Sequence, residues 1–289
     1  MRSWLGWRAV PEQALPPPPE PLAGTVFDSH CHLDAMSARA GRTARGEPAG
    51  PEFVAAAVAD ASAVGVSRLV NVGCEVAEWQ SALDSTEHPA VYCALAVHPT
   101  EVTDLTDEHY AELERLLGHP KVVAVGETGL DYYWDRTEPA LQQEHFRRHI
   151  ELAKRVDKPL VIHDRDAHAD VLRILREQGA PPAGVVFHAF SGDAEMAGEC
   201  VRAGYLLSFS GVLTFSNAPA LREAARVTPR ESMLVETDAP FLTAHPYRGR
   251  PNAPYLIPHV VRLLAELKQL PESVVCDTIW ATGERVFGI

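Results

Sequence analysis

The sequence has little positive charge for its length. Its 26 Lys and Arg residues stand against 39 Asp and Glu residues, which gives a net charge of −13. A protein that held a polyanion by bulk charge would show the opposite balance. Any contact with a nucleic acid must therefore be local or bridged by bound cations.

Long apolar runs and paired cysteines are also missing. No run approaches the roughly 18–20 residues of a membrane span, so we expect no membrane partner. Five cysteines are scattered without a CxxC pair, and most lie in apolar runs: Cys31, Cys74, Cys93, Cys200 and Cys276. This usage is typical of buried, reduced thiols and favours a cytoplasmic location.

Neither a GxGxxG nor a GxxxxGK[ST] pattern follows an early strand, so a nucleotide-binding doubly wound sheet has little support. The 289 residues suffice for two ordinary domains or one barrel-sized domain. Residues 1–24 contain four consecutive prolines and lack the apolar centre of a signal peptide. We interpret them as a flexible leader that precedes one domain over residues 25–289.

Strand-like and helical segments alternate through this domain. Eight short runs are apolar throughout, which is typical of parallel strands covered on both faces: 25–29, 68–73, 91–97, 121–126, 159–162, 184–187, 205–209 and 233–237. Each is followed by helical sequence, whereas residues 36–50, rich in Gly, Ala and Arg, suggest a mobile loop. Eight such units predict a (β/α)8 TIM barrel, with an open doubly wound sheet as the alternative.

Metal-ligand side chains recur at the predicted strand ends. His30 and His32 are two residues apart, so an extended backbone points both imidazoles to one face. Six candidates lie at the carboxyl ends of the first, fourth, fifth, sixth and eighth strands: His30, His32, Glu127, His163, His188 and Asp238. These strand ends converge on one face of a barrel, where active sites are built.

The number of candidate ligands indicates the chemistry. Four His, one Glu and one Asp are too many for one tetrahedral ion but suit two divalent ions roughly 3.5–4 Å apart. Glu127 lies across the barrel from His30 and His32, which makes it the natural bridge. Asp238 has a second use, because it can accept the proton of an attacking water. We therefore assign Glu127 and Asp238 as catalytic residues.

Several ordered motifs resemble the TatD-type metal-dependent deoxyribonucleases, which are amidohydrolase-like TIM barrels. The resemblance runs from about Val26 to Phe287 and rests on motifs that begin at Asp28 (DSHCHL), Gly126 (GETGLDY), Val161 (VIHDR), His188 (HAFSG), Glu236 (ETDAP) and Pro246 (PYRGRPN). It implies hydrolysis of DNA phosphodiester bonds by a 3′–5′ exonuclease that acts on single strands or 3′ ends.

The resemblance also implies a role for each ligand. His30 and His32 match the pair on the first metal, with Asp238 on that ion and Glu127 as the bridge, and His163 and His188 match the pair on the second. Mg²⁺ is the activating ion that the family implies. Zn²⁺, Mn²⁺ or another transition ion is a second option, which the histidine-rich ligand set favours.

Substrate contacts are predicted beside the ligands. Arg165 and Arg248 offer local donors for a phosphate, and Tyr132 leads an aromatic run that can stack a base or cap the barrel rim. For Arg250 a solvated, structural role is favoured. We expect a monomer with DNA as its partner.

Four positions depart from the family pattern. Ala189 replaces a frequent Cys, Thr100 replaces the second His of HPH, Ser216 replaces the Lys of TFKNA, and Ala253 replaces the Glu of NEP. None removes a predicted ligand, but together they leave open which residues bind the substrate.

Two other readings remain. An amidohydrolase, lactonase or aminoacyl-ester hydrolase uses the same barrel, but many amidohydrolases bridge their metals with a carboxylated lysine, and Lys121 lies at the wrong end of the fourth strand. An inactive metal-binding or nucleic-acid scaffold would not need Asp238.

Overall fold

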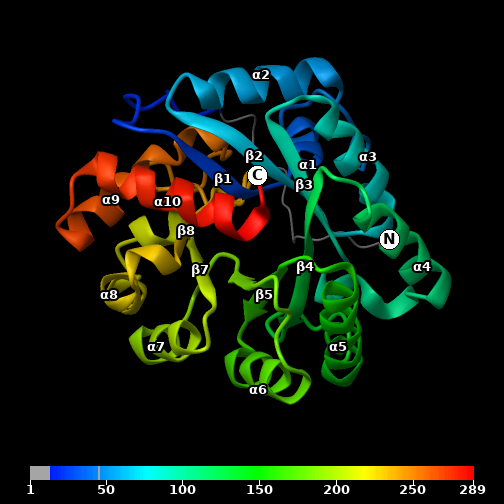
Figure 1. Cartoon of the computed structure of the whole chain (residues 1–289). Helices are drawn as coiled ribbons and strands as arrows, with labels where there is room; N and C mark the ends of the chain where they lie inside the picture. Colours follow the sequence, from blue (N-terminus) through cyan, green and yellow to red (C-terminus); the bar gives the residue numbers. More distant parts are fainter. Residues whose placement is uncertain (1–13, 45) are drawn as a thin grey trace.

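The computed structural model describes residues 14–44 and 46–289 as a barrel of parallel strands surrounded by helices (Figure 1). The strands are β1 Val26–Cys31, β2 Val66–Gly73, β3 Val91–Leu95, β4 Val122–Asp131, β5 Leu160–Arg165, β6 Val185–Phe187, β7 Leu206–Phe209 and β8 Met233–Val235. They form one eight-stranded sheet in chain order, and all neighbouring pairs are parallel. The predicted TIM barrel is confirmed.

Helices connect the strands and cover the outside of the sheet (Figure 1). They are α1 Leu33–Arg39, α2 Pro51–Ser62, α3 Trp79–Asp84, α4 Asp107–Leu117, α5 Pro139–Val156, α6 His168–Gln178, α7 Ala194–Arg202, α8 Pro219–Val227, α9 Pro258–Lys268 and α10 Glu272–Phe287. Local sequence sets several of their ends. For example, the Thr106 hydroxyl accepts the first-turn N–H of His109 to begin α4, and α5 begins with a proline.

Backbone hydrogen bonds join the first strand to the residues after the last. His32 N donates to Ala239 O at 2.8 Å, and Asp238 N donates to His30 O at 2.9 Å. The buried carboxyl group of Asp28 also accepts the Thr237 N–H at 2.9 Å and contacts the Thr237 hydroxyl. These contacts close the barrel and place His30, His32 and Asp238 side by side.

The buried apolar residues form two clusters. One packs between the strands and the outer helices. The other takes residues from all eight strands, including Phe27, Val161 and Leu234, together with Val286 and Phe287 of α10. Because neighbouring strand residues point to opposite faces, this second cluster fills the barrel interior.

Helix α10 packs against the amino-terminal end of β1. The Phe27 ring makes edge contacts with Trp280 and Phe287, with centroids 5.8 and 6.2 Å apart. Gly283 is required there, since a Cβ at this position would lie 1.2 Å from Phe27 Cζ. The opposite, carboxyl-terminal end of the barrel is the end that carries the predicted ligands.

Two sequence-based boundaries were wrong. Residues 36–50 were expected to form a loop, but α1 continues to Arg39 because Leu33 and Met36 are buried. The fourth strand was expected to end before Glu127, yet β4 runs to Asp131 and is buried throughout. The motif GETGLD is therefore part of a strand that extends past the end of β3 and pairs with β5 as far as Asp131 and Arg165.

The predicted flexible leader is bound to the barrel over the part that the structure describes. Arg250 Nη2 donates to Leu15 O at 2.8 Å, Tyr255 Oη donates to Pro16 O at 2.6 Å, and Arg262 Nη2 donates to Glu20 O at 2.8 Å. Residues 1–13 of the predicted leader lie outside the described residues. Arg250 was expected to be solvated, but its guanidinium donates to the main-chain carbonyls of Ala14 and Leu15.

All five cysteines are reduced and buried, as predicted. Cys31 points away from the two histidines that flank it, and its Sγ contacts Val70 O at 3.6 Å. Among the described helices, none has both the length and the apolar character needed to cross a membrane.

A buried histidine behind β4 predicts an acid-sensitive fold. His149 on α5 lies 2.9 Å from the Thr128 hydroxyl, and burial lowers its pKa from the ordinary 6.5 to about 3. As the pH falls below 6.5, the imidazole of His149 is protonated in the unfolded chain but stays neutral in the folded one. The free energy of unfolding therefore decreases between pH 6.5 and 3. We expect His149→Gln to remove a dependence of about 1.4 kcal/mol per pH unit from the free energy of unfolding.

Urea unfolding at intervals from pH 7 to pH 4.5 measures this slope. Gln at His119, an exposed position, is the control and should leave the slope unchanged. An identical slope in wild type and His149→Gln would contradict the prediction.

Candidate metal centre

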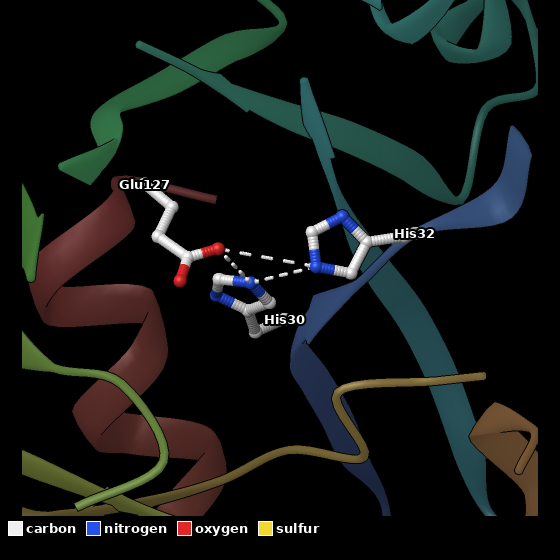
Figure 2. A group of neighbouring side chains, drawn as sticks. All are labelled: His30, His32 and Glu127. Atoms are coloured by element: carbon white, nitrogen blue, oxygen red, sulfur yellow. Dashed lines mark hydrogen bonds and ion pairs between the residues drawn. The ribbon is translucent and has the colours of Figure 1, made fainter. Parts of the chain in front are cut away.

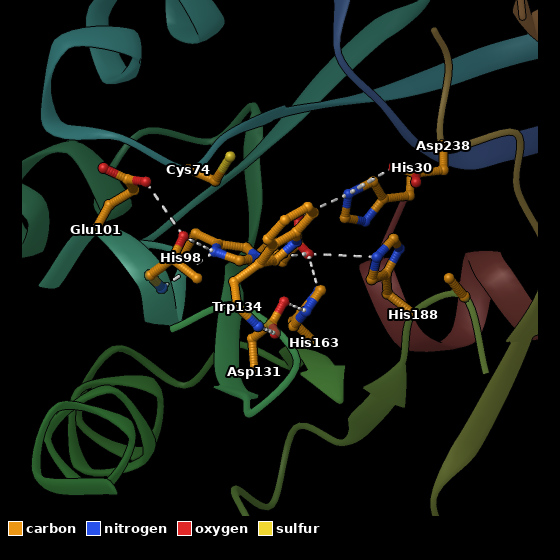
Figure 3. Close-up of polar contacts among 12 residues, drawn as sticks. His30, Cys74, His98, Glu101, Asp131, Trp134, His163, His188 and Asp238 are labelled. Atoms are coloured by element: carbon orange, nitrogen blue, oxygen red, sulfur yellow. Dashed lines mark hydrogen bonds and ion pairs between the residues drawn. The ribbon is translucent and has the colours of Figure 1, made fainter. Parts of the chain in front are cut away.

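The six predicted ligands converge at the carboxyl-terminal end of the barrel (Figures 2 and 3). They come from β1, β4, β5 and the segments that follow β1, β6 and β8. His30, His32, Glu127 and His188 are buried, whereas the side chains of His163 and Asp238 retain 15% and 13% exposure. Their role as ligands stays a prediction, but the sequence-based expectation that they share one site agrees with their positions.

Glu127 lies at the centre of this group and divides its two oxygens between two histidine pairs. Its Oε2 is 3.2 Å from His30 Nε2 and 3.9 Å from His32 Nε2 (Figure 2). Its Oε1 is 2.6 Å from His163 Nδ1 and 3.3 Å from His188 Nε2. A carboxylate in this position can serve a ligand site on each side.

Asp238 completes the side that holds His30 and His32. Its Oδ1 lies 3.3 Å from His32 Nε2 and 3.9 Å from His30 Nε2. The backbone of Asp238 has a positive φ of 54°, a conformation that Asp and Asn tolerate better than most residues. The two histidine Nε2 atoms are themselves 3.2 Å apart.

Burial and neighbouring charges shift the proton affinities of these groups. Burial opposes ionisation of Glu127, but the adjacent imidazoles, with His188 foremost, hold its pKa well below the usual range. For His163, hydrogen bonds to Asp131 and Glu127 outweigh burial and raise its pKa to about 9. Burial lowers the pKa of His30, in contrast. The centre therefore combines an ionised carboxylate with imidazoles that differ in basicity.

Outer carboxylates contact the second histidine pair. Asp131 Oδ2 lies 3.0 Å from His163 Nε2, and Glu236 Oε1 lies 2.8 Å from His188 Nδ1. In each case the carboxylate meets the ring nitrogen opposite the one that faces Glu127. Such partners orient metal-binding histidines.

Sequence reasoning missed three residues of this site: His98, Asp131 and Glu236. His98 Nε2 lies 3.8 Å from Glu127 Oε1, and its Nδ1 accepts the Thr100 N–H at 3.2 Å (Figure 3). Each stood in a motif that the sequence analysis quoted, so a signal was present. The spacing alone did not show which of their side chains face the centre.

The donor set fits divalent ions. Three triads each offer ligand atoms within 4.8 Å of one another: His30, His32 and Glu127; His30, His188 and Glu236; and His98, Glu127 and His163. Imidazole nitrogens with carboxylate oxygens are ligands for Zn²⁺, Mn²⁺ and related ions. Two triads share Glu127, which agrees with a bridging position.

The proposed substrate residues Tyr132, Arg165 and Arg248 lie at or after the carboxyl ends of β4, β5 and β8. Arg165 lies over the Tyr133 ring, with its Cζ 3.8 Å from the centroid, and Tyr133 is 54% exposed. Tyr132, the predicted contact, is half-buried; its hydroxyl donates to Asp170 Oδ2 at 2.8 Å and accepts from Gln143 Nε2 at 2.7 Å, and its role toward substrate stays a prediction. Arg248 is exposed and lies over Phe215, with its Cζ 4.3 Å from the centroid. The exposed ring is therefore Tyr133.

Fold and site together define a metal-dependent hydrolase of the TIM-barrel class. The family described as TatD related DNase matches residues 27–288, and the chain belongs to this family. The match covers nearly the whole barrel and confirms the resemblance seen in the motifs.

Relatives and solved structures agree with this assignment. The uncharacterized metal-dependent hydrolase TatD of Mycobacterium tuberculosis is 48% identical, over 91% of this chain and 98% of that protein. The uncharacterized metal-dependent hydrolase YabD of Bacillus subtilis is 38% identical, over 91% and 99%. The structure of YjjV, a TatD homologue from Escherichia coli, aligns with a TM-score of 0.83 at 28% identity, over 91% of this chain and 98% of that one.

The central position of Glu127 predicts that metal content depends on it. Glu127→Ala removes an oxygen from each side of the centre, so we expect the bound ions to fall from two per chain to one or none. Elemental analysis after gel filtration measures the content, and Glu114→Ala on α4 is the control. A single bound ion that Glu127→Ala leaves in place would contradict the prediction.

Proposed function

We propose that this protein hydrolyses phosphodiester bonds of DNA and removes nucleotides from the 3′ end of single strands, with two divalent ions as cofactors. The observation that carries the proposal is the division of the Glu127 oxygens between the two histidine pairs. The family description, TatD related DNase, supports the same substrate class. Mg²⁺ or Mn²⁺ is the proposed activating ion.

Two ions held by these side chains would lower the pKa of a shared water and neutralise charge on the scissile phosphate. The protein supplies the geometry for this chemistry. His30 and His32 hold one side of the centre and His163 and His188 the other, while the buried Glu127 keeps a negative charge between them. The burial of these side chains also limits the access of bulk water to the centre.

Asp238 is the proposed proton acceptor. It lies between the His30–His32 pair and the opening, and it keeps more solvent exposure than Glu127 does. A carboxylate there can accept the proton of the attacking water and pass it to solvent. Glu127 is less suited to this step, because its two oxygens already face imidazoles.

Features around the opening support a nucleic-acid substrate despite the overall acidic charge. Arg165 supplies positive charge two residues beyond His163, and its guanidinium lies over the exposed ring of Tyr133, with Cζ 3.8 Å from the centroid. An aromatic side chain of this kind can stack a terminal base without regard to its identity. A local cation and an aromatic surface suit a single-strand end better than a long duplex.

Hydrolysis of a carboxylic ester or amide is the competing function. An engineered organophosphate hydrolase derived from a lactonase has the same fold, with a TM-score of 0.59 at 16% identity, and this likeness concerns the fold alone. Ser216 stands in place of the family's lysine, so other residues would have to bind the phosphate. A substrate panel therefore has to include lactones and amides.

The role of Asp238 predicts a large loss of activity in Asp238→Asn. Asn tolerates the positive φ and keeps the shape of the side chain, but it accepts no proton. We expect hydrolysis of a 3′-labelled single strand with Mg²⁺ or Mn²⁺ to fall about 10²–10⁴-fold. Release of labelled mononucleotide measures the rate, and Asp277→Asn, exposed on α10, is the control.

If wild type releases no nucleotide with any ion tested but hydrolyses a lactone or amide, the DNase proposal fails. If Asp238→Asn retains wild-type activity on DNA, the proposed proton acceptor is wrong while the substrate class stands.

The exposed ring of Tyr133 predicts a binding effect. Tyr133→Ala removes the surface on which a base would stack, and stacking contributes about 1–3 kcal/mol. We expect the KM for a single-stranded oligonucleotide to rise about 5-fold or more, with kcat changed less. Tyr133→Phe keeps the ring and serves as the matched control. An unchanged KM in Tyr133→Ala would contradict a stacking role.

A further inference from the structure

The side chain of Asp131 contacts His163 of the centre and is fixed by two backbone hydrogen bonds. Its Oδ1 accepts the N–H groups of Tyr133 and Trp134, both at 3.0 Å. Its Oδ2 lies 3.0 Å from His163 Nε2. The side chain is buried at the end of β4 and is therefore held in one orientation.

His163 lies between two carboxylates (Figure 3). Its Nδ1 is 2.6 Å from Glu127 Oε1, and its Nε2 is 3.0 Å from Asp131 Oδ2. A neutral imidazole carries one proton, so one of these nitrogens keeps a lone pair and the other donates. Glu127 can also accept a proton from Nδ1, but an ion that binds beside Glu127 requires a lone pair on Nδ1, and the proton must then lie on Nε2 toward Asp131.

We propose that Asp131 is a positioning residue that keeps the proton of His163 on Nε2 and so leaves Nδ1 free to bind the second divalent ion. This inference rests on the proposed two-ion centre. The Asp131 carboxylate only accepts hydrogen bonds, so it favours the tautomer in which Nε2 donates. Metal ligands held by a carboxylate in this way are more basic and less mobile.

Asparagine at position 131 would reverse the arrangement. The two backbone N–H groups of Tyr133 and Trp134 require an oxygen at the Oδ1 position, so the amide NH₂ must take the place of Oδ2. This NH₂ then faces His163 Nε2, which has to become an acceptor. The imidazole proton moves to Nδ1, where Glu127 Oε1 accepts it, and the lone pair for the ion is lost.

Glu236 provides a matched comparison on the other histidine of the pair. Its Oε1 accepts the Ala189 N–H at 2.7 Å and lies 2.8 Å from His188 Nδ1. In Glu236→Gln the amide oxygen can stay at this position and serve both groups. Asp131→Asn and Glu236→Gln thus remove the same charge from the same half of the centre, but only Asp131→Asn inverts a tautomer.

The first test measures metal binding. Metal-free full-length protein is titrated with Mn²⁺, and the electron paramagnetic resonance signal of free Mn²⁺ gives the number and affinity of the sites. We expect two sites in wild type, a second site weakened 10–100-fold in Asp131→Asn, and a first site changed less than twofold. Glu236→Gln should weaken the second site by clearly less than Asp131→Asn. Asp170→Asn, which lies on α6 and contacts Tyr132, is the control.

Equal weakening of the second site by Asp131→Asn and Glu236→Gln would overturn the proposal, because loss of charge alone would then explain both. Unchanged binding in Asp131→Asn, or equal weakening of both sites, would overturn it as well.

The second test reads the tautomer without metal. Long-range ¹⁵N–¹H spectra of the histidine rings are recorded on metal-free protein at pH 10, and the signals of His163 are identified by their loss in His163→Gln. We expect the proton on Nε2 in wild type and on Nδ1 in Asp131→Asn. The same tautomer in both proteins would refute the role of Asp131.

The ring spectra also separate the proposal about Asp131 from the proposal of a two-ion centre. If wild type binds only one Mn²⁺, the two-ion centre fails, and the spectra alone then decide whether Asp131 sets the tautomer.

Discussion

The hydrogen bonds that close the barrel between β1 and β8 are the contacts on which the rest of the site depends. His32 N to Ala239 O and Asp238 N to His30 O join backbones from the two ends of the domain. Three of the four residues that make these bonds, His30, His32 and Asp238, carry side chains of the proposed first ion site. Closure of the barrel and assembly of the site are therefore one event, and Asp28, buried beside Thr237, strengthens the same junction.

Within that frame, Glu127 sets the electrostatics of the pocket. A buried carboxylate is costly unless it is paired, and here five imidazoles lie within 3.9 Å of its two oxygens. Bound divalent ions would take the place of protons on these groups, so metal binding and charge balance are linked. This local concentration of positive charge offers a physical account of how a chain with a net charge of −13 could approach a phosphodiester.

Much of this arrangement could be predicted because a parallel barrel has a simple geometry. Strands that are apolar throughout predict burial on both faces, and residues at their carboxyl ends must meet at one rim. His30, His188 and Asp238 could be found in this way. The length of β4 could not, since a strand that continues past Glu127 to Asp131 looks the same in sequence as a strand followed by a loop. The docking of residues 14–21 on Arg250, Tyr255 and Arg262 was missed because a proline-rich segment has no periodicity to read.

The sequence by itself determined the class of fold, the set of six candidate ligands and the family, because each depends on residue types at fixed spacings along the chain. Tertiary structure alone decided which atoms face one another. It showed that Glu127 turns one oxygen to each histidine pair, that Tyr133 rather than Tyr132 is exposed at the opening, and that Asp131 reaches the outer nitrogen of His163. These relations depend on the register and closure of strands that are distant in the chain, and no local pattern encodes the direction in which such side chains point.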